Sequence, residues 1–329
     1  MSDAVDPVDP VEHIEPVERG SSLWLDAWRR LRKNKVSLVS GVILVLLAIA
    51  CVLHPELSRY HYDEADLALG ATGPSGAHWF GTDDHGRDLL VRCTFGGRIS
   101  LAVGVIATSI SFTIGATWGG VAGYFGGRID SFMMRIVDVL YTFPLLIFVI
   151  LLTAFFANPD TVFYDAFVST LSIVKKDAHD PSYLPLFKIF FVFGALGAMS
   201  WLTMARIVRG QVLSLRNQLF VEAARSVGVG HFGLIFRHLL PNALGPIIVY
   251  TTLTIPELML TEAFLSFLGL GTEEPLSSWG QLVSTGVEAL DLYPWLTVFP
   301  GALLAVTLFC FNFLGDGLRD ALDPRIRKD

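Results

Sequence analysis

Residues 222–228 read EAARSVG, residues 238–242 read HLLPN, and both stretches lie in a polar segment between two long apolar runs. Alanines favour a helix and let another surface approach closely, while the glycines within residues 228–230 predict the end of that helix. The surrounding segment, residues 206–242, is basic. We expect a membrane protein that keeps such a segment between two spans to present it to a soluble partner.

The composition of the whole chain indicates a membrane protein. Hydrophobic residues make up 52% of it and charged residues 17%, whereas a soluble domain carries about 25% charged residues. The hydrocarbon core of a bilayer is about 30 Å thick and requires about 20 apolar residues per helix. Six such runs predict an all-α polytopic membrane protein with spans at 36–53, 99–122, 132–156, 184–204, 243–268 and 295–314.

The segments outside the membrane domain, residues 36–314, predict how the chain is organised at its ends. Residues 1–20 interleave acidic residues with prolines, which predicts a disordered acidic tail. Residues 21–35 place two tryptophans and a leucine on one helical face, which favours an amphipathic helix at the membrane surface, or else a plain basic flank. Residues 315–329 predict a short C-terminal tail.

The distribution of basic residues predicts the orientation of the spans. Of the 24 lysines and arginines, 17 fall at the two ends and in the loops on the same side as residues 206–242. Cytoplasmic loops carry the excess of lysine and arginine in membrane proteins. We therefore expect both termini and residues 206–242 in the cytoplasm, and residues 269–294, which contain neither lysine nor arginine, outside.

The basic segment divides into helical pieces. We expect residues 206–220 to continue the fourth span, residues 221–227 to form a short helix that projects from the membrane, and residues 228–230 to break it. Glu222 is expected to be the polar contact or the cap of this short helix.

A second amphipathic piece follows the break. Residues 231–240 place Phe232, Ile235 and Leu239 on one side of a helix. Pro241 is expected to start the fifth span, since proline is favoured in a first helical turn.

The sequence shows no pattern typical of an enzyme. A Walker A loop, which binds ATP phosphates, ends in Gly-Lys-Ser/Thr, and none of the six lysines follows a glycine. The three cysteines have no spacing of a disulfide framework or a metal site. We expect no catalytic residue, cofactor or metal on this chain, so that any ATP hydrolysis would come from another chain.

Charged residues inside the predicted spans are the next candidates. Glu257 and Glu262 lie in the fifth span with no cation in the same segment, and Pro256 is expected to kink that helix. Both glutamates are expected to face either a water-filled translocation path or a partner helix. In the third span, Arg135 and Asp138 lie one turn apart and are candidates to pair with each other.

The EAARSVG stretch, with the glycines and the Leu-Pro that follow it, resembles the EAA loop of ABC-importer permeases. Further stretches resemble motifs of the same family, and they are residues 78–90, 123–127, 204–211, 264–271, 274–280 and 313–324. The resemblance covers nearly the whole chain after residue 20. It is to the C-type permease subunit of bacterial oligopeptide importers, within the dipeptide/oligopeptide/nickel group.

The resemblance implies a type I importer-permease fold in the bacterial inner membrane and a complex of several subunits. A second homologous permease would complete the pore, two ATPase subunits would bind ATP and Mg²⁺, and an extracytoplasmic binding protein would deliver the peptide cargo; no nucleic acid is implied. In this family the EAA loop docks on the ATPase. The residues that carry this role over to the present chain are Glu222, Ala223, Ala224, Gly228, Phe232, Arg237, His238 and Pro241.

Two alternatives stay open at this point. The cargo could be a dipeptide or nickel, carried by the same kind of permease, or the chain could be an ion-coupled secondary transporter, for which Pro256 beside Glu257 gives weak support.

One stretch also departs from the family. Residues 157–183 form a longer outer loop than expected, which is either a docking surface or a tolerated insertion.

Overall fold

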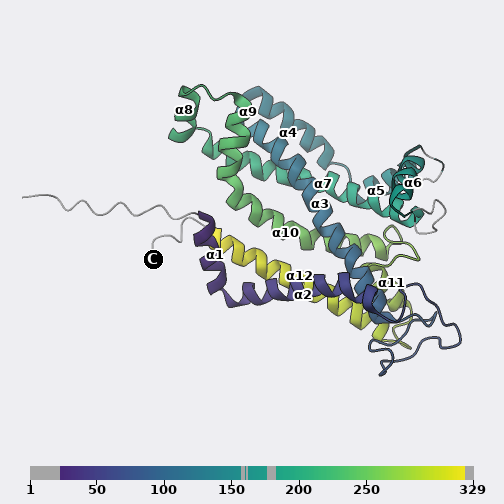
Figure 1. Cartoon of the computed structure of the whole chain (residues 1–329). Helices are drawn as coiled ribbons and strands as arrows, with labels where there is room; N and C mark the ends of the chain where they lie inside the picture. Colours follow the sequence, from purple (N-terminus) through teal and green to yellow (C-terminus); the bar gives the residue numbers. More distant parts are fainter. Residues whose placement is uncertain (1–22, 157–159, 161, 176–182, 323–329) are drawn as a thin grey trace, which may run out of the picture.

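The computed structural model describes residues 23–156, 160, 162–175 and 183–322, so the predicted acidic tail and residues 323–329 of the predicted C-terminal tail lie outside the described residues, whereas residues 315–322 of that tail continue the last long helix. The described part is built from helices, which confirms the all-α fold class (Figure 1). In chain order they are α1 (Leu23–Lys33), α2 (Lys35–Leu57), α3 (Leu89–Phe125), α4 (Gly127–Tyr141), α5 (Leu145–Phe156), α6 (Val162–Lys175), α7 (Tyr183–Leu215), α8 (Leu219–Ser226), α9 (His231–Gly233), the π-helical η1 (Leu234–Leu239), α10 (Leu240–Phe267), α11 (Trp279–Glu288) and α12 (Trp295–Leu322).

Five helical stretches of the described chain are long and apolar enough to cross a membrane, namely α2, α3, α7, α12 and the continuous run from α9 to α10. Their outer faces expose large apolar side chains, for example Val45, Leu46 and Val52 on α2. Such faces are stable against lipid but not against water. α10 runs without interruption through Pro256.

The third predicted span, residues 132–156, is not one helix. α4 ends at Tyr141, α5 begins at Leu145, and the two helices meet at 82°. Pro144 explains the break, because proline has no N–H to donate and forces the preceding residue out of the helical conformation. The predicted span over 132–156 is therefore a bent pair, α4 with α5, which makes a sixth span only if the two helices are counted as one.

Part of the predicted outer loop 157–183 is also helical. α6 packs on the start of α7 through aromatic side chains, since the rings of Tyr164 and Phe167 each lie 5.2 Å from the ring of Phe187. The prediction of a loop is therefore wrong for residues 162–175, whereas residues 176–182 lie outside the described part.

The packing of α3 against α7 forms the centre of the molecule. Gly115, Gly119 and Gly123 follow one another at helical spacing on the face of α3 that meets α7. A Cβ atom added to Gly115 would lie 2.6 Å from Cβ of Met204, and one added to Gly119 would overlap the carbonyl oxygen of Ala205. Small residues at this spacing let two membrane helices approach closely, and here they hold α3 and α7 together along much of their length.

The two ends of the bundle carry different structures (Figure 1). We call one the α8 end, because α8 lies there together with α1, and the other the α11 end, where α11 and residues 58–88 lie. At the α11 end Arg87 and Arg92 are buried and both bond to Asp83 and to Glu274, on the loop between α10 and α11.

The charges of this cluster are matched. Burial alone would raise the pKa of the Asp83 carboxyl, but Arg92 and Arg87 hold it below its ordinary value. The hydrogen bond from Arg87 likewise holds the pKa of Glu274 below its ordinary value. The cluster ties the segment before α3 to the segment before α11.

Candidate functional site

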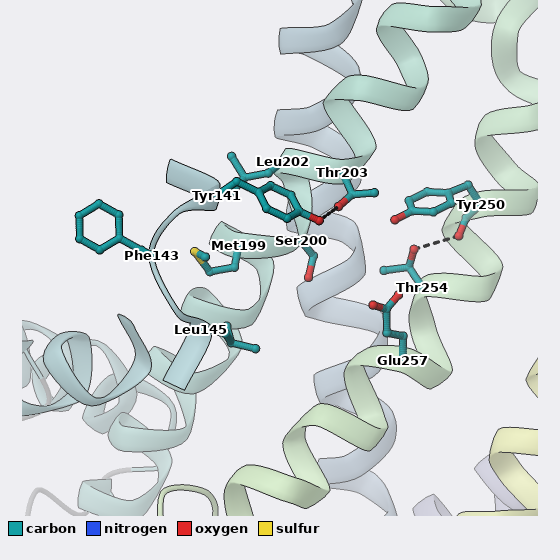
Figure 2. A pocket seen from close by; sticks show the side chains of 10 residues that line it. All are labelled: Tyr141, Phe143, Leu145, Met199, Ser200, Leu202, Thr203, Tyr250, Thr254 and Glu257. Carbon is teal, nitrogen blue, oxygen red and sulfur yellow. Dashed lines mark hydrogen bonds between the residues drawn. The ribbon is translucent and has the colours of Figure 1, made fainter. Parts of the chain in front are cut away.

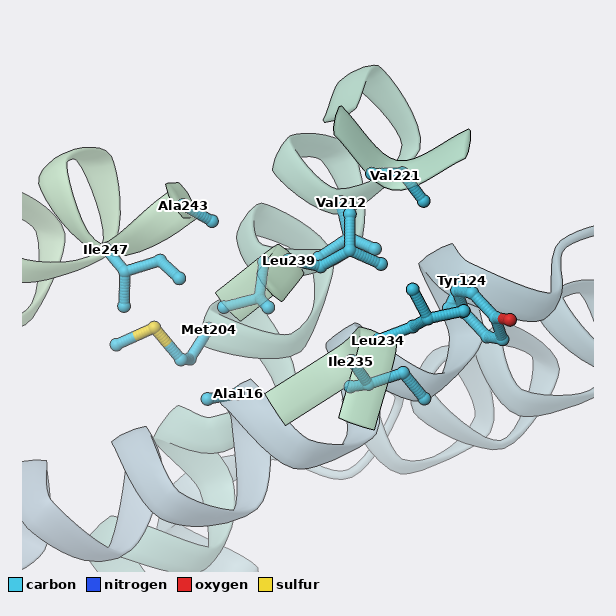
Figure 3. Close-up of a cluster of buried hydrophobic side chains, with 11 residues drawn as sticks. Ala116, Tyr124, Met204, Val212, Val221, Leu234, Ile235, Leu239, Ala243 and Ile247 are labelled. Carbon is cyan, nitrogen blue, oxygen red and sulfur yellow. The ribbon is translucent and has the colours of Figure 1, made fainter. Parts of the chain in front are cut away.

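The short helix α8 is anchored to the bundle by one apolar face. Val221 is fully buried and belongs to a cluster of side chains from α3, α7, η1 and α10 (Figure 3). The buried members are Ala116, Tyr124, Met204, Val208, Val212, Val221, Leu234, Ile235, Leu239, Ala243 and Ile247. Because these side chains come from four elements, α8 is attached to the membrane helices and not merely tethered by loops.

The opposite face of α8 is open. Glu222 and Ala223 are exposed, and the apolar side chains Leu219 and Val227 at its two ends are 84% and 86% exposed. Large apolar side chains that project into water beside a single carboxylate are typical of a surface that a partner covers. The side chain of Glu222 caps no helix within the described residues, so the alternative of a contact residue is the one that the geometry favours.

The turn after α8 requires a glycine. Gly228 has φ +87°, in the left-handed region that favours glycine. Val227 and Gly228 donate backbone hydrogen bonds back to Ala223 and Arg225, which closes the helix. The predicted break at residues 228–230 is therefore confirmed.

The piece after the turn differs from the prediction. Ile235 and Leu239 are buried, but Phe232 is 76% exposed and lies against Phe236, with ring centroids 4.5 Å apart. The predicted common face is wrong for Phe232 because the wider π-helical turn of η1 starts at Leu234 and changes the rotation between Phe232 and the residues after it.

Pro241 does not begin a separate span. The helical run passes from η1 into α10 at Leu240, and Pro241 lies exposed in its first turn. The side-chain amide of Asn242 donates to the carbonyl of His238 at 2.6 Å. Arg237 is exposed and His238 half-buried on the same stretch, and neither belongs to the buried cluster.

Two contacts that the sequence did not predict fix this region to the bundle. The hydroxyl of Tyr124 on α3 lies 2.7 Å from Nδ1 of His231. Arg209 on α7 donates two hydrogen bonds to the carboxylate of Asp130 on α4, one of them at 2.6 Å. Such bidentate pairs restrain direction as well as distance, so Arg209 and Asp130 hold α7 to α4. Tyr124 and His231 link α3 to the start of the stretch after α8.

The charged residues of the third span pair differently from the sequence expectation. Asp138 accepts a hydrogen bond from Arg206 of α7 at 2.8 Å, not from Arg135. The guanidinium of Arg206 also lies 4.4 Å from the ring centroid of Tyr141. The bend after α4 brings Tyr141 and Asp138 to α7, which residue spacing within one helix could not predict.

A cavity of about 320 Å³ lies beside this contact, between the α4–α5 bend, α7 and α10 (Figure 2). Tyr141 and Thr203 border it, with their hydroxyl groups 3.0 Å apart. Glu257 of α10 is exposed and lines the same cavity. On insertion scales a charge in mid-membrane costs about 2.5–3.5 kcal/mol, so this carboxylate requires water or an opposite charge.

Glu262 lies in a different setting. It is 1% exposed, and its Oε1 accepts a hydrogen bond from the hydroxyl of Ser266 at 2.7 Å. The expectation that both glutamates face a path or a partner helix is therefore not met by Glu262, which is enclosed by its own chain. Pro256, next to Glu257, is buried as well.

Residues 102–328 match the profile of a protein family described as the inner membrane component of binding-protein-dependent transport systems. The chain belongs to this family. The N-terminal residues 22–74 of the permease also match a profile described as the N-terminal transmembrane domain of oligopeptide transport permease C.

Curated relatives of this permease cover almost its whole length. It is 47% identical to the oligopeptide transport system permease protein OppC of Escherichia coli over 94% of this chain and 93% of that protein. It is 43% identical to OppC of Bacillus subtilis, over 94% and 92%. A dipeptide transport permease, DppC of Bacillus subtilis, is also 43% identical, over 92% of this chain and 86% of that protein.

Among solved structures, a chain of the MetNI methionine ABC transporter in an inward-facing conformation is similar, with 18% identity and a TM-score of 0.48. It covers 70% of this permease and 96% of that chain. Family membership makes the permease a multi-pass inner membrane component that works with an ATPase and a binding protein.

Proposed function

We propose that this permease forms one half of the translocation pore of an ATP-driven peptide importer and that α8 docks on a separate ATPase subunit. The coupling surface comprises Glu222, Ala223, Ala224, Gly228, Phe232, Arg237, His238 and Pro241. The observation that carries the proposal is the two-sided character of α8, whose buried Val221 holds it to four elements while its other face exposes apolar side chains.

The rest of the complex follows from the same proposal. A second homologous permease completes the pore as a heterodimer, two ATPase subunits bind ATP and Mg²⁺, and an extracytoplasmic binding protein delivers peptide at the α11 end. The excess of basic residues at the α8 end supports a bacterial inner membrane protein with both termini in the cytoplasm. This chain would bind no cofactor.

Oligopeptides are the proposed cargo because relatives named oligopeptide permeases share up to 47% of their residues with this chain over nearly its full length. Dipeptides are a second candidate, supported by the 43% identity to a dipeptide transport permease. Nickel, which the sequence resemblance leaves open, is the third cargo to test.

The test is the ATPase activity of the reconstituted complex, assembled from this permease, the second permease, the ATPases and the binding protein. We expect tripeptides to pentapeptides to stimulate ATP hydrolysis several-fold, with weaker stimulation by dipeptides and none by Ni²⁺. Stimulation by Ni²⁺ alone would contradict peptide cargo. Full peptide stimulation in a complex that carries Glu222→Lys on α8 would contradict docking of the ATPase on α8.

A further inference from the structure

The carboxylate of Glu257 on α10 has no charged partner among the described residues. It is exposed and accepts no hydrogen bond from any residue that the structure describes, although three hydroxyl-bearing side chains, Ser200, Thr203 and Thr254, border the same cavity. In Figure 2 its carboxylate points toward Thr254 and the space between α7 and α10. A carboxylate in this position needs a cation or water opposite it.

No arginine or lysine lines the described cavity, and the arginine that contacts one of its lining residues, Tyr141, already has a carboxylate partner. Arg206 bonds to Asp138 at 2.8 Å and stacks on the ring of Tyr141. Glu257 is therefore an anion without a cation of its own in the described chain, in a cavity whose wall combines hydroxyl groups with the rings of Tyr141 and Tyr250.

This combination suits a primary ammonium group. An ammonium group has three N–H donors and no acceptor, which matches one carboxylate and two hydroxyl oxygens, and it is attracted to the faces of tyrosine rings. A guanidinium already lies over one such ring here, at 4.4 Å from its centroid. The cavity volume of about 320 Å³ has room for the first residue of a peptide but not for a whole oligopeptide.

We propose that Glu257 is a transient binding site for the N-terminal ammonium group of a peptide passing through the pore. This inference rests on the proposed peptide cargo. Glu257 accepts the charge-assisted hydrogen bond, while Thr254 and Ser200 offer hydroxyl oxygens beside it. Because Glu257 is exposed, solvent would screen the ion pair and keep it weak enough for release.

The experiment uses the complex in lipid nanodiscs without the binding protein, so that the selectivity of the binding protein does not enter. The probe is a tripeptide with a benzophenone side chain on its first residue, with either a free or an acetylated amine. We expect the free amine to label residues around Thr254 and Tyr250 about fivefold more than the acetylated form, as mapped by mass spectrometry.

Variants identify the group responsible. Glu257→Gln is expected to reduce labelling by the free amine to the level of the acetylated peptide, and Glu257→Asp is expected to keep most of it. Glu288→Gln removes an equally exposed carboxylate at the α11 end and is expected to change nothing.

Three outcomes would overturn the inference. These are equal labelling by both peptides, unchanged labelling in Glu257→Gln, and loss of the second permease from the purified Glu257→Gln complex, which would make Glu257 a packing residue. None of these would affect the proposed function, because peptide stimulation of the wild-type ATPase is measured separately. Absence of that stimulation would instead contradict the peptide cargo itself.

Discussion

The α11 end and the α8 end of the permease differ in whether their costly side chains are compensated within the chain. At the α11 end, buried arginines find their acids within the chain, as Arg87 and Arg92 do with Asp83. At the α8 end, the apolar side chains of Leu219, Val227 and Phe232 project outward with nothing from the described chain to cover them. The buried charges of the first end are paired within the chain, whereas the exposed apolar side chains around α8 favour a partner outside it.

The difference teaches where to look for function in a membrane subunit. Internal ion pairs contribute to the stability of the region that contains them, whereas exposed apolar side chains indicate a surface that a partner covers. Changes at the α11 end should therefore act on stability, and changes at the α8 end on coupling. The predictions that follow test this division, beginning with the largest expected loss of stability.

Breaking the α11 cluster should cost the most. Arg92→Met removes one of the two arginines that face Asp83, both side chains being less than 10% exposed. Loss of one partner of a buried pair leaves a charge without compensation and costs about 3 kcal/mol. Thermal unfolding of the purified complex measures this loss of stability. Lys188→Met breaks the exposed pair with Glu273 and should cost under about 1 kcal/mol. Equal losses of unfolding free energy in both variants would contradict a stabilising role of the buried α11 cluster.

Separating α3 from α7 should cost somewhat less. Gly119→Ala places a methyl group against the carbonyl oxygen of Ala205, and overpacking of this kind costs about 1–3 kcal/mol. Gly210→Ala on α7 is the matched control, because no atom lies within 4 Å of its added Cβ. If the unfolding curves of the two variants coincide, α3 and α7 tolerate a wider spacing and the close approach at Gly119 is not needed for stability.

Changing the turn after α8 should act on coupling with only a moderate loss of stability. Gly228→Pro imposes a negative φ where the chain has +87°, at a cost of about 1–2 kcal/mol. We expect a complex that inserts into the membrane but whose peptide-stimulated ATPase activity falls about tenfold or more. Gly230→Ala, at a position with ordinary backbone and open space, should retain activity. Normal uptake by Gly228→Pro would contradict a rigid coupling element.

The smallest effect on stability is expected for Glu222→Lys. The side chain is exposed, and substitutions at such positions usually change stability by less than about 0.5 kcal/mol. Coupling should nevertheless be lost if α8 docks on the ATPase as proposed, because the reversed charge would then lie in that interface. Co-purification of the ATPase and uptake of peptide measure this. Glu288→Lys, the same charge change at the α11 end, should leave both unchanged, and a similar loss in the two variants would point to a general charge effect.

Much of the fold was predictable from patterns that act along one helix. Apolar runs predicted the five long helices, because a lipid environment selects length and composition directly. The turn at Gly228 was predictable because a left-handed conformation favours one residue type.

The missed features depend on contacts between distant residues. The effect of Pro144 on the third span was readable in principle, but the pairing of Asp138 with Arg206 depends on where the bend places α4. The exposure of Phe232 depends on a π-helical turn, and α6 is held by rings from α7. In the candidate site, the break after α8 was predicted from its glycines, but the different burial of Glu257 and Glu262 was not visible from their spacing.

The tight seam between α3 and α7 has a mechanical consequence. With 37 residues at 1.5 Å each, α3 is about 55 Å long, nearly twice the thickness of the hydrocarbon core. Because its glycines let α3 pack closely against α7, we expect the two helices to rotate together as one rigid body about a point within the membrane. A tilt of about 10° around its midpoint would carry the tip beside α8 sideways by about 5 Å, which is close to the pitch of one helical turn. A small rotation inside the bilayer would thus become a displacement of about one helical pitch at the surface that we propose contacts the ATPase.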